Sequence, residues 1–262
     1  MNFRTIEISD PLFEPKGFRF ITVKSIALKN RADVSVFIPE SAKGKVRVPV
    51  IVLLHGVYGS HWAWTMKGNA HNTLISMIEN GESAPFVLVM PSDGLWGDGS
   101  GYVSHGIQDF EKWIGEEVPS LMKQTIDEVD ADSKIFISGL SMGGYGAFRI
   151  GLKFSSFYKG ISGHSLITDI AQMKNFVEED WSFSNGIDGR GIQNLISGMN
   201  AIPPARFDCG LDDYLLIPNQ ELHKFLMHSN IPHEYQEFPG GHNWNYWQDK
   251  IKLTYRFFSR LV

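Results

Sequence analysis

The strongest chemical signal in this sequence is a serine set between two glycines, in the order Gly139, Ser141 and Gly143. A run of β-branched and aromatic residues precedes it, and small residues that suit the start of a helix follow it. A serine on a sharp strand-to-helix turn presents its hydroxyl in the open, and glycines are needed where a Cβ would clash. Because three fixed residues recur easily by chance, it is this strand and helix context that predicts a nucleophile at Ser141.

A serine hydroxyl is a poor nucleophile until an imidazole takes its proton and a carboxylate orients that imidazole. Two turns downstream supply these groups: Asp212 and Asp213 follow one predicted strand, and His242 follows the last one. The order serine, acid, histidine is that of α/β-hydrolases. We expect His242 to be the base and Asp213 the acid, with Asp212 as the alternative acid. Asp208 lies inside the predicted strand and is expected to be structural.

Acyl transfer through a serine also needs N–H donors for the oxyanion that forms on the substrate carbonyl. The backbone N–H of Met142, directly after the nucleophile, is the first expected donor. The second should come from the turn after the first long apolar run, where Gly56 permits a tight backbone. We expect the N–H of Val57 to be this second donor, and we interpret His55 as a structural residue.

Aromatic residues near the same turns are candidates for the walls of an acyl or alcohol pocket. Tyr58 and Trp62 follow the oxyanion turn, Trp96 lies in a Gly-rich loop at 92–102, and Trp181 lies further downstream. We predict all four as substrate-binding residues. Packing in the core is the alternative for each, because aromatic side chains offer a core its largest apolar groups.

The elements that must position these residues alternate along the chain. Strands are predicted at 48–54, 86–91, 134–140, 159–163, 205–210 and 235–238. Helices are predicted at 69–79, 107–121, 142–154 and 219–228, with a last helix from 244. The helix at 107–121 is expected to bend at Pro119. Residues 18–26 and 33–38 alternate in polarity, which predicts an antiparallel hairpin at a sheet edge.

This alternation predicts an α/β-hydrolase fold, with a mostly parallel central sheet and helices on both faces. A chain of 262 residues suits a single domain, expected to span 1–262. Residues 164–203 interrupt the alternation and are expected to form a small cap-like insertion over Ser141; an inert surface excursion is the alternative. The side chains expected to wall an apolar pocket there are Trp181, Phe183, Ile187, Ile192 and Leu195, and polar contacts are expected from Asp169, Asp180 and Asp188.

Composition excludes several other classes of protein. The net charge is −5 and no Lys/Arg cluster occurs, which argues against a nucleic-acid partner. The nine histidines lack the spacing of a zinc site, and a single cysteine, Cys209, excludes an internal disulfide. No apolar run has membrane-spanning length, and the first residues do not resemble a signal peptide. A cytoplasmic protein is therefore expected, while a secreted protein whose leader has been removed stays open.

Four segments of the sequence resemble the esterase D group. They are Leu53–Gly56, Gly139–Ala147, Cys209–Asp213 and Gly240–Trp244, and the resemblance runs from about residue 17 to the C-terminus. That group includes tributyrin-type esterases, S-formylglutathione hydrolases, feruloyl and acetylxylan esterases and mycolyltransferases. Its pattern places the acid just before an aromatic residue, which favours Asp213. The sequence departs from the group in the loop after Gly56 and in residues 164–203.

These observations together predict a serine carboxylesterase that hydrolyses short-chain acyl esters through Ser141, His242 and Asp213, with no metal or organic cofactor. The expected partner is a small-molecule ester, and a homo-oligomer is left open. The alternatives are a feruloyl or acetyl esterase acting on carbohydrate, or a thioesterase of the S-formylglutathione type. The turn Val57–Ser60 lacks the cysteine usual in that thioesterase branch. A further alternative, from another class, is a non-catalytic binding protein with the same fold.

Overall fold

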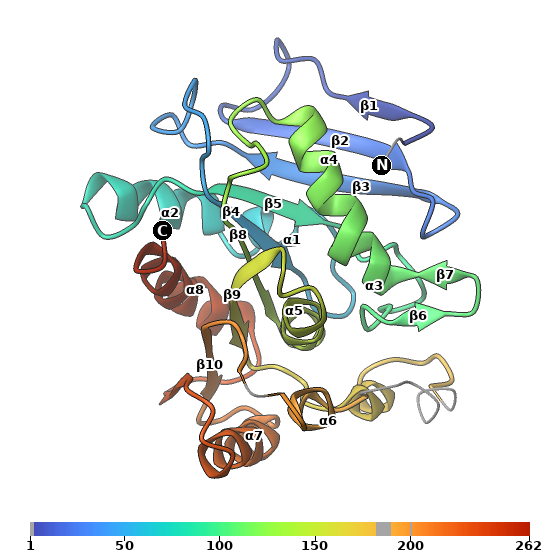
Figure 1. Cartoon of the computed structure of the whole chain (residues 1–262), viewed down its shortest axis with the longest axis vertical. Helices are drawn as coiled ribbons and strands as arrows, with labels where there is room; N and C mark the ends of the chain where they lie inside the picture. The colour runs from blue at the N-terminus through green and yellow to red at the C-terminus, as the bar shows by residue number, and fades with distance from the viewer. Residues whose placement is uncertain (1–2, 182–189, 200) are drawn as a thin grey trace.

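The computed structural model describes residues 3–181, 190–199 and 201–262 (Figure 1). Within these residues, nine strands form one sheet in the order β1-β2-β3-β5-β4-β8-β9-β10-β11. Their bounds are β1 (Ile6–Ile8), β2 (Phe18–Lys24), β3 (Arg31–Phe37), β4 (Val50–Leu54), β5 (Val87–Pro91), β8 (Ile135–Leu140), β9 (Tyr158–His164), β10 (Ala205–Gly210) and β11 (Glu234–Phe238). The strands from β5 to β11 pair in parallel, and β1, β2 and β3 add on in antiparallel fashion.

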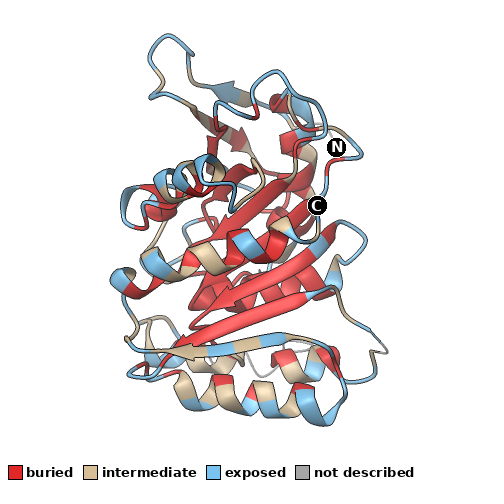
Figure 2. Ribbon diagram, turned by 90° about the vertical axis from the view of Figure 1, so that its left-hand side faces the viewer, coloured by how far each residue is buried: buried red, intermediate tan, exposed pale blue. Residues whose placement is uncertain are grey.

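The mostly parallel sheet confirms the predicted fold class. The predicted hairpin is present as β2 and β3, which pair from Phe18 with Phe37 to Lys24 with Arg31. It is not the edge of the sheet, however, because β1 pairs outside β2. A three-residue strand with only weak alternation carries little sequence signal, which explains why β1 was missed. Figure 2 shows the central strands buried throughout, as their continuous apolar runs predicted.

Helices cover both faces of the sheet. The helices are α1 (Ala63–Met66), α2 (Ala70–Glu79), α3 (Phe110–Lys112), α4 (Val118–Thr125), α5 (Met142–Lys153), α6 (Ile192–Ile196), α7 (Leu216–His228) and α8 (Trp244–Ser259). Along β4, Val50 and Val52 pack with the α4 and α5 side, whereas Ile51 and Leu53 pack with the α2 and α8 side. In Figure 1, α4 crosses in front of β2 and β3. The alternating side chains of a strand thus feed two separate cores.

The helix predicted at 107–121 is wrong at its start. Ile107 is 82% exposed in the turn between two short strands, β6 (Ser104–His105) and β7 (Gln108–Asp109). The helical run begins at Phe110 and passes through a π-helical turn, η1 (Trp113–Glu117), before α4. Pro119 lies in the first turn of α4, directly after the π-helical turn.

The π-helical turn ends at Glu117, whose side chain is fully buried and hydrogen-bonded to another segment of the chain. The Glu117 carboxylate accepts hydrogen bonds from the Ser25 hydroxyl and from the backbone N–H groups of Ile26 and Ala27. Inserting one residue per turn changes the phase of the helix, which a search for a 3.6-residue period does not detect.

The described part of the 164–203 segment contains a 3₁₀ helix, η2 (Ile170–Asn175), and α6. Asp169 caps η2 by accepting from the Ala171 N–H, and its carboxylate lies 3.3 Å from Arg190. Phe183, Ile187 and Asp188 lie outside the described residues. Among the described helices, none combines the length and the apolar character needed to span a membrane.

Candidate active site

Ser141 lies at the turn between β8 and α5, with φ 53° and ψ −120°. Two positions before and after Ser141, the backbone is too crowded for a residue with a side chain. A Cβ on Gly139 would collide with the Gly143 carbonyl, and one on Gly143 would collide with the Leu54 carbonyl. The Ser141 N–H donates to the His164 carbonyl at the end of β9, 2.9 Å away. The turn therefore projects the Ser141 side chain from the carboxyl edge of the sheet.

The structure brings Ser141, His242 and Asp213 together. The Ser141 Oγ lies 3.0 Å from His242 Nε2, and His242 Nδ1 lies 2.9 Å from Asp213 Oδ2 and 3.1 Å from Oδ1. Asp213 is buried and also accepts from the Leu215 N–H at 2.8 Å, whereas Asp212 is exposed. A buried carboxylate on one side of an imidazole and a hydroxyl on the other form the arrangement that transfers a proton from serine.

The loop carrying His242 depends on two glycines that approach closely. Gly240 has φ +125°, and a Cβ on Gly210 would overlap the Gly240 carbonyl. The rings of Tyr214 and Trp247 flank the imidazole, with centroids 4.6 Å and 4.9 Å from that of His242. These contacts fix the plane of the ring, so that its two nitrogens face Ser141 and Asp213.

The two predicted oxyanion donors are backbone N–H groups close to Ser141. Within the described residues, the N–H groups of Val57 and Met142 donate no hydrogen bond. The neighbouring Tyr58 N–H is occupied, because it donates to the Asp98 carbonyl at 2.8 Å. A Cβ on Gly56 would lie 3.4 Å from the Ser141 Cβ, which places the Val57 turn beside the serine.

His55 has the contacts of a structural residue. Its Nε2 accepts the Asp93 N–H at 3.1 Å, so the ring proton lies on Nδ1 and is donated to the Gly56 carbonyl at 2.7 Å. The ring is 2% exposed and ties the Gly56 turn to the start of the 92–102 loop.

A cavity of about 430 Å³ opens over Ser141 and His242. Its other lining residues are Gly56, Val57, Tyr58, Gly59, Trp62, Ala63, Lys67, Leu140, Asn175, Phe176, Tyr214, Trp244 and Trp247. Tyr58 and Trp62, two of the four predicted substrate-binding residues, thus line this cavity. Trp96 and Trp181 lie outside this lining, packed against each other with ring centroids 5.9 Å apart, and Trp181 is 4% exposed.

Several aromatic residues of this lining were missed from the sequence, namely Phe176, Tyr214, Trp244 and Trp247. Three of them had a usable signal, because they follow Asp213 or His242 within five residues. Phe176 had none; it reaches the cavity from the end of η2, where its carbonyl accepts the Tyr58 hydroxyl. Burial and the charge of Asp213 raise the pKa of Tyr214 to about 12, so its hydroxyl stays protonated at neutral pH.

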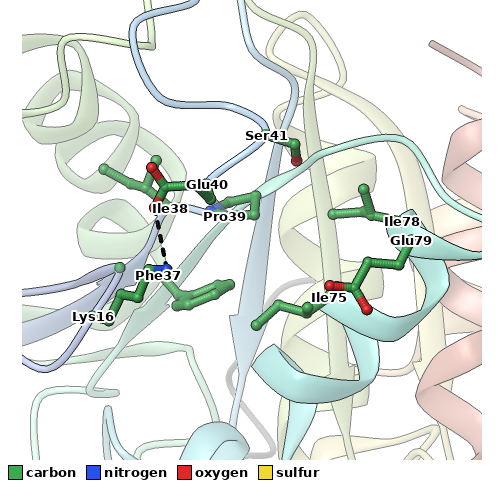
Figure 3. A pocket seen from close by; sticks show the side chains of 10 residues that line it. Lys16, Phe37, Ile38, Pro39, Glu40, Ser41, Ile75, Ile78 and Glu79 are labelled. Carbon is green, nitrogen blue, oxygen red and sulfur yellow. Dashed lines mark ion pairs between the residues drawn. The ribbon is translucent and has the colours of Figure 1, made fainter.

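A second groove of about 290 Å³ lies at the opposite end of the sheet (Figure 3). It is formed by residues 37–41 at the end of β3 and directly after it, and by Ile75, Ile78 and Glu79 of α2. Lys16 and Glu40 form an ion pair of 3.9 Å at its rim. No residue of the Ser141 cavity belongs to it. Among the described residues, no cluster of three or more His, Cys, Asp or Glu side chains could hold a metal ion.

Comparisons with known proteins identify the family of this chain. The model of a family described as "Putative esterase" matches residues 25–189, more than half of the chain. A relative named acetyl esterase, from Caldicellulosiruptor saccharolyticus, is 28% identical over 232 residues, covering 80% of this chain and 83% of the relative. A solved ferulic acid esterase has a TM-score of 0.79 at 22% identity, covering 98% of this chain and 99% of that one.

An S-formylglutathione hydrolase from Staphylococcus aureus also has this fold, with a TM-score of 0.76 at 17% identity and coverage of 97% of this chain and 99% of that one. The chain belongs to the esterase family whose model it matches, and it has the α/β-hydrolase fold. It is a serine esterase, a carboxylic ester hydrolase, as the sequence predicted.

Proposed function

We propose that this esterase hydrolyses short-chain acyl esters through a triad of Ser141, His242 and Asp213. The observation that carries the proposal is the unbroken chain of contacts from the Ser141 Oγ through the His242 imidazole to the buried Asp213 carboxylate, with steps of 3.0 and 2.9 Å.

In the first half of the reaction, Ser141 Oγ attacks the ester carbonyl carbon and His242 Nε2 takes the hydroxyl proton. The carbonyl oxygen becomes an oxyanion, which the N–H groups of Val57 and Met142 stabilise. The tetrahedral intermediate then collapses: the bond to the alcohol oxygen breaks, and the imidazolium returns its proton to the departing alkoxide. An acyl group is left on Ser141.

In the second half, water takes the place of the alcohol. His242 removes a proton from the water as its oxygen attacks the acyl carbon, and the same N–H groups hold the second oxyanion. The bond to Ser141 Oγ breaks as the proton passes to it, releasing the carboxylic acid. Asp213 holds the Nδ1 proton throughout, so Nε2 is the nitrogen that accepts and donates.

The preference for short acyl chains follows from the walls of the cavity. Phe176 and Tyr214 lie over the serine, with ring centroids 5.4 Å apart, and Phe176 is stacked parallel to the His242 ring at 6.4 Å. A chain that cannot pass this wall loses about 1 kcal/mol or more of transition-state binding per methylene. We also propose that residues 164–203, which supply Asn175 and Phe176, act as a small cap within one hydrolase domain.

Feruloyl or acetyl esters of carbohydrate remain the second candidate class. The aromatic side chains of the cavity favour it, since Trp62 and Trp244 offer flat surfaces on which a sugar or a phenolic ring can stack. A relative named acetyl esterase is 28% identical to this chain. A thioester substrate has weaker support, because Val57–Ser60 lacks the cysteine of that branch.

The test is the specificity constant kcat/KM for nitrophenyl esters from acetate to decanoate, measured beside methyl ferulate and acetylated xylan. Acetate and butyrate esters are expected to exceed decanoate by at least tenfold. Faster turnover of methyl ferulate than of every nitrophenyl ester would move the assignment to the second class. An organophosphate probe that labels no residue would instead favour the non-catalytic alternative.

A further inference from the structure

Five buried polar side chains form a closed hydrogen-bonded ring beneath the candidate active site, and a sixth, Tyr246, is hydrogen-bonded to that ring. They come from three neighbouring elements: Ser162 and His164 of β9, Arg206 and Asp208 of β10, and Tyr246 and Thr254 of α8. Tyr246 is 4% exposed, and each of the other five is 1% exposed or less. None of them lines the cavity over Ser141.

One half of the ring runs from Arg206 through two hydroxyl groups to His164. Arg206 can only donate, and its Nη1 donates to the Ser162 hydroxyl at 3.2 Å. The Ser162 and Thr254 hydroxyls are hydrogen-bonded at 2.6 Å, and the Thr254 hydroxyl is hydrogen-bonded to His164 Nε2 at 2.8 Å.

The ring closes on Asp208, whose carboxylate can only accept. His164 Nδ1 donates to Asp208 Oδ2 at 2.8 Å, and Arg206 Nη2 donates to the same oxygen at 2.6 Å. The Tyr246 hydroxyl donates to the other oxygen, Oδ1, at 2.8 Å. Burial by itself raises the pKa of Asp208, but His164 and Arg206 outweigh that effect and hold the pKa at about 2.

Burying such a network has a large desolvation cost. Each polar group loses its water, and the charges of Arg206 and Asp208 lose theirs as well, so apolar side chains of similar volume could stabilise the fold equally well. Hydrogen bonds are directional, whereas apolar contacts are not. The network therefore holds the elements that it joins in one defined arrangement.

The joined elements are those that carry the candidate catalytic residues. The carbonyl of His164 accepts the Ser141 N–H at 2.9 Å, β10 leads directly into the turn that ends at Asp213, and α8 begins two residues after His242. The Tyr246 ring also packs against the His242 loop, since a Cβ on Gly240 would lie 2.9 Å from it. Thr254, further along α8, adds a second anchor on the same face.

We infer that the ring is a positioning device, which fixes α8 on β9 and β10 so that His242 meets both Ser141 and Asp213. The six residues are positioning residues and take no part in bond making or breaking. This inference rests on the proposed roles of Ser141, His242 and Asp213. Because a displacement of about 1 Å can cost a hundredfold in rate, loosening one anchor should reduce kcat without removing substrate contacts.

The experiment compares Thr254→Val, Thr254→Ser and Tyr246→Phe with the wild-type protein. Valine keeps the shape of threonine but leaves the Ser162 hydroxyl and His164 Nε2 without their partner, whereas serine keeps the hydroxyl. Tyr255→Phe is the matched control, because Tyr255 is also a buried tyrosine of α8 and donates to the Ala70 carbonyl at 3.0 Å, outside the ring. Thr125→Val removes a comparable hydroxyl from α4.

We expect Thr254→Val and Tyr246→Phe to reduce kcat for nitrophenyl butyrate at least tenfold, with KM within about twofold of wild type. Thr254→Ser should restore most of kcat. All rates are measured well below the melting temperature of each variant, so that a smaller folded fraction does not contribute. The two controls are expected to lower the melting temperature while keeping kcat within twofold.

The inference is overturned if folded Thr254→Val and Tyr246→Phe keep the kcat of their controls, or if Thr254→Ser is as slow as Thr254→Val. Should Thr254→Val fail to fold, the comparison of Tyr246→Phe with Tyr255→Phe decides alone. A wild-type rate that survives Ser141→Ala would refute the proposed function instead, and this variant is therefore measured in the same series.

Discussion

The reactivity proposed for Ser141 depends on a backbone conformation that most residues avoid. A non-glycine residue at φ 53° and ψ −120° is strained by about 1–3 kcal/mol, and surrounding contacts must hold it there. The Ser141 N–H is held by the His164 carbonyl, and the Ser141 carbonyl accepts the N–H groups of Gly144 and Ile167 at 3.0 and 3.3 Å. Strain at this one residue is therefore balanced by two neighbouring segments.

The two adjacent carboxylates at the end of β10 should differ sharply in their effect on rate. Asp213→Asn is expected to reduce kcat about ten-thousandfold, because an amide stabilises the wrong imidazole tautomer. Asp212→Asn changes an exposed side chain and should leave kcat within a few-fold of wild type. Steady-state kinetics with nitrophenyl butyrate measures both. A larger loss of kcat for Asp212→Asn than for Asp213→Asn would mean that Asp212 is the acid of the triad.

At the scale of elements, the wall over Ser141 is supplied by the residue after η2 rather than by the tryptophan predicted for it. Phe176 lines the cavity, whereas Trp181 is buried beside Trp96. The loop at 92–102 fits against Trp181 so closely that a Cβ on Gly101 would lie 2.6 Å from its ring. We therefore interpret Trp181 as a packing residue and Phe176 as a residue that sets acyl-chain length.

Phe176→Ala should raise kcat/KM for decanoate relative to butyrate at least tenfold, since the substitution removes the ring but keeps the carbonyl that accepts the Tyr58 hydroxyl. Trp181→Ala should leave this ratio unchanged and lower the free energy of unfolding by about 3–5 kcal/mol. The ester series is measured for both variants and for Phe157→Ala, whose ring is 41% exposed and outside the cavity. An unchanged ratio in Phe176→Ala would show that η2 does not set specificity.

The elements nearest the candidate site were those best predicted from sequence. Two local signals identify these elements. At Gly139 and Gly143 the surrounding backbone leaves no room for a Cβ. Continuous apolar runs such as 50–54 are long enough to define buried strands. The grouping of Ser141, Asp213 and His242 follows from the rule that parallel strands end at one edge.

What escaped prediction depends on contacts distant in the sequence. The π-helical turn at Trp113–Glu117 is tied to the partners that Glu117 finds at Ser25–Ala27, about ninety residues earlier. Phe176 reaches the cavity only because η2 folds back onto Tyr58. Asp208 was expected to be structural, and its ring of partners spans residues 162–254, which no local pattern reveals.

At the scale of the whole molecule, the buried ring links stability to pH. The pKa of Asp208 falls from 3.8 to about 2 on folding, so the folded state binds this proton less tightly than the unfolded state does. The stabilisation is therefore complete above about pH 4 and is lost as the pH falls through 2; its size is on the order of 2 kcal/mol.

Asp208→Asn should thus be less stable than wild type at pH 7, and the difference should shrink between pH 4 and pH 2. Urea unfolding of both proteins across this range, followed by circular dichroism, measures it. A difference that stays constant down to pH 2 would mean that Asp208 does not carry its charge in the folded protein.

The most direct test of the account is the rate of ester hydrolysis by purified Ser141→Ala. Loss of the serine of such a triad costs on the order of a millionfold in turnover. We predict that Ser141→Ala, with the circular dichroism spectrum of the wild type, hydrolyses nitrophenyl butyrate no faster than the buffer background and takes up no organophosphate. Retention of more than a few per cent of the wild-type rate would contradict the assignment and place the nucleophile elsewhere.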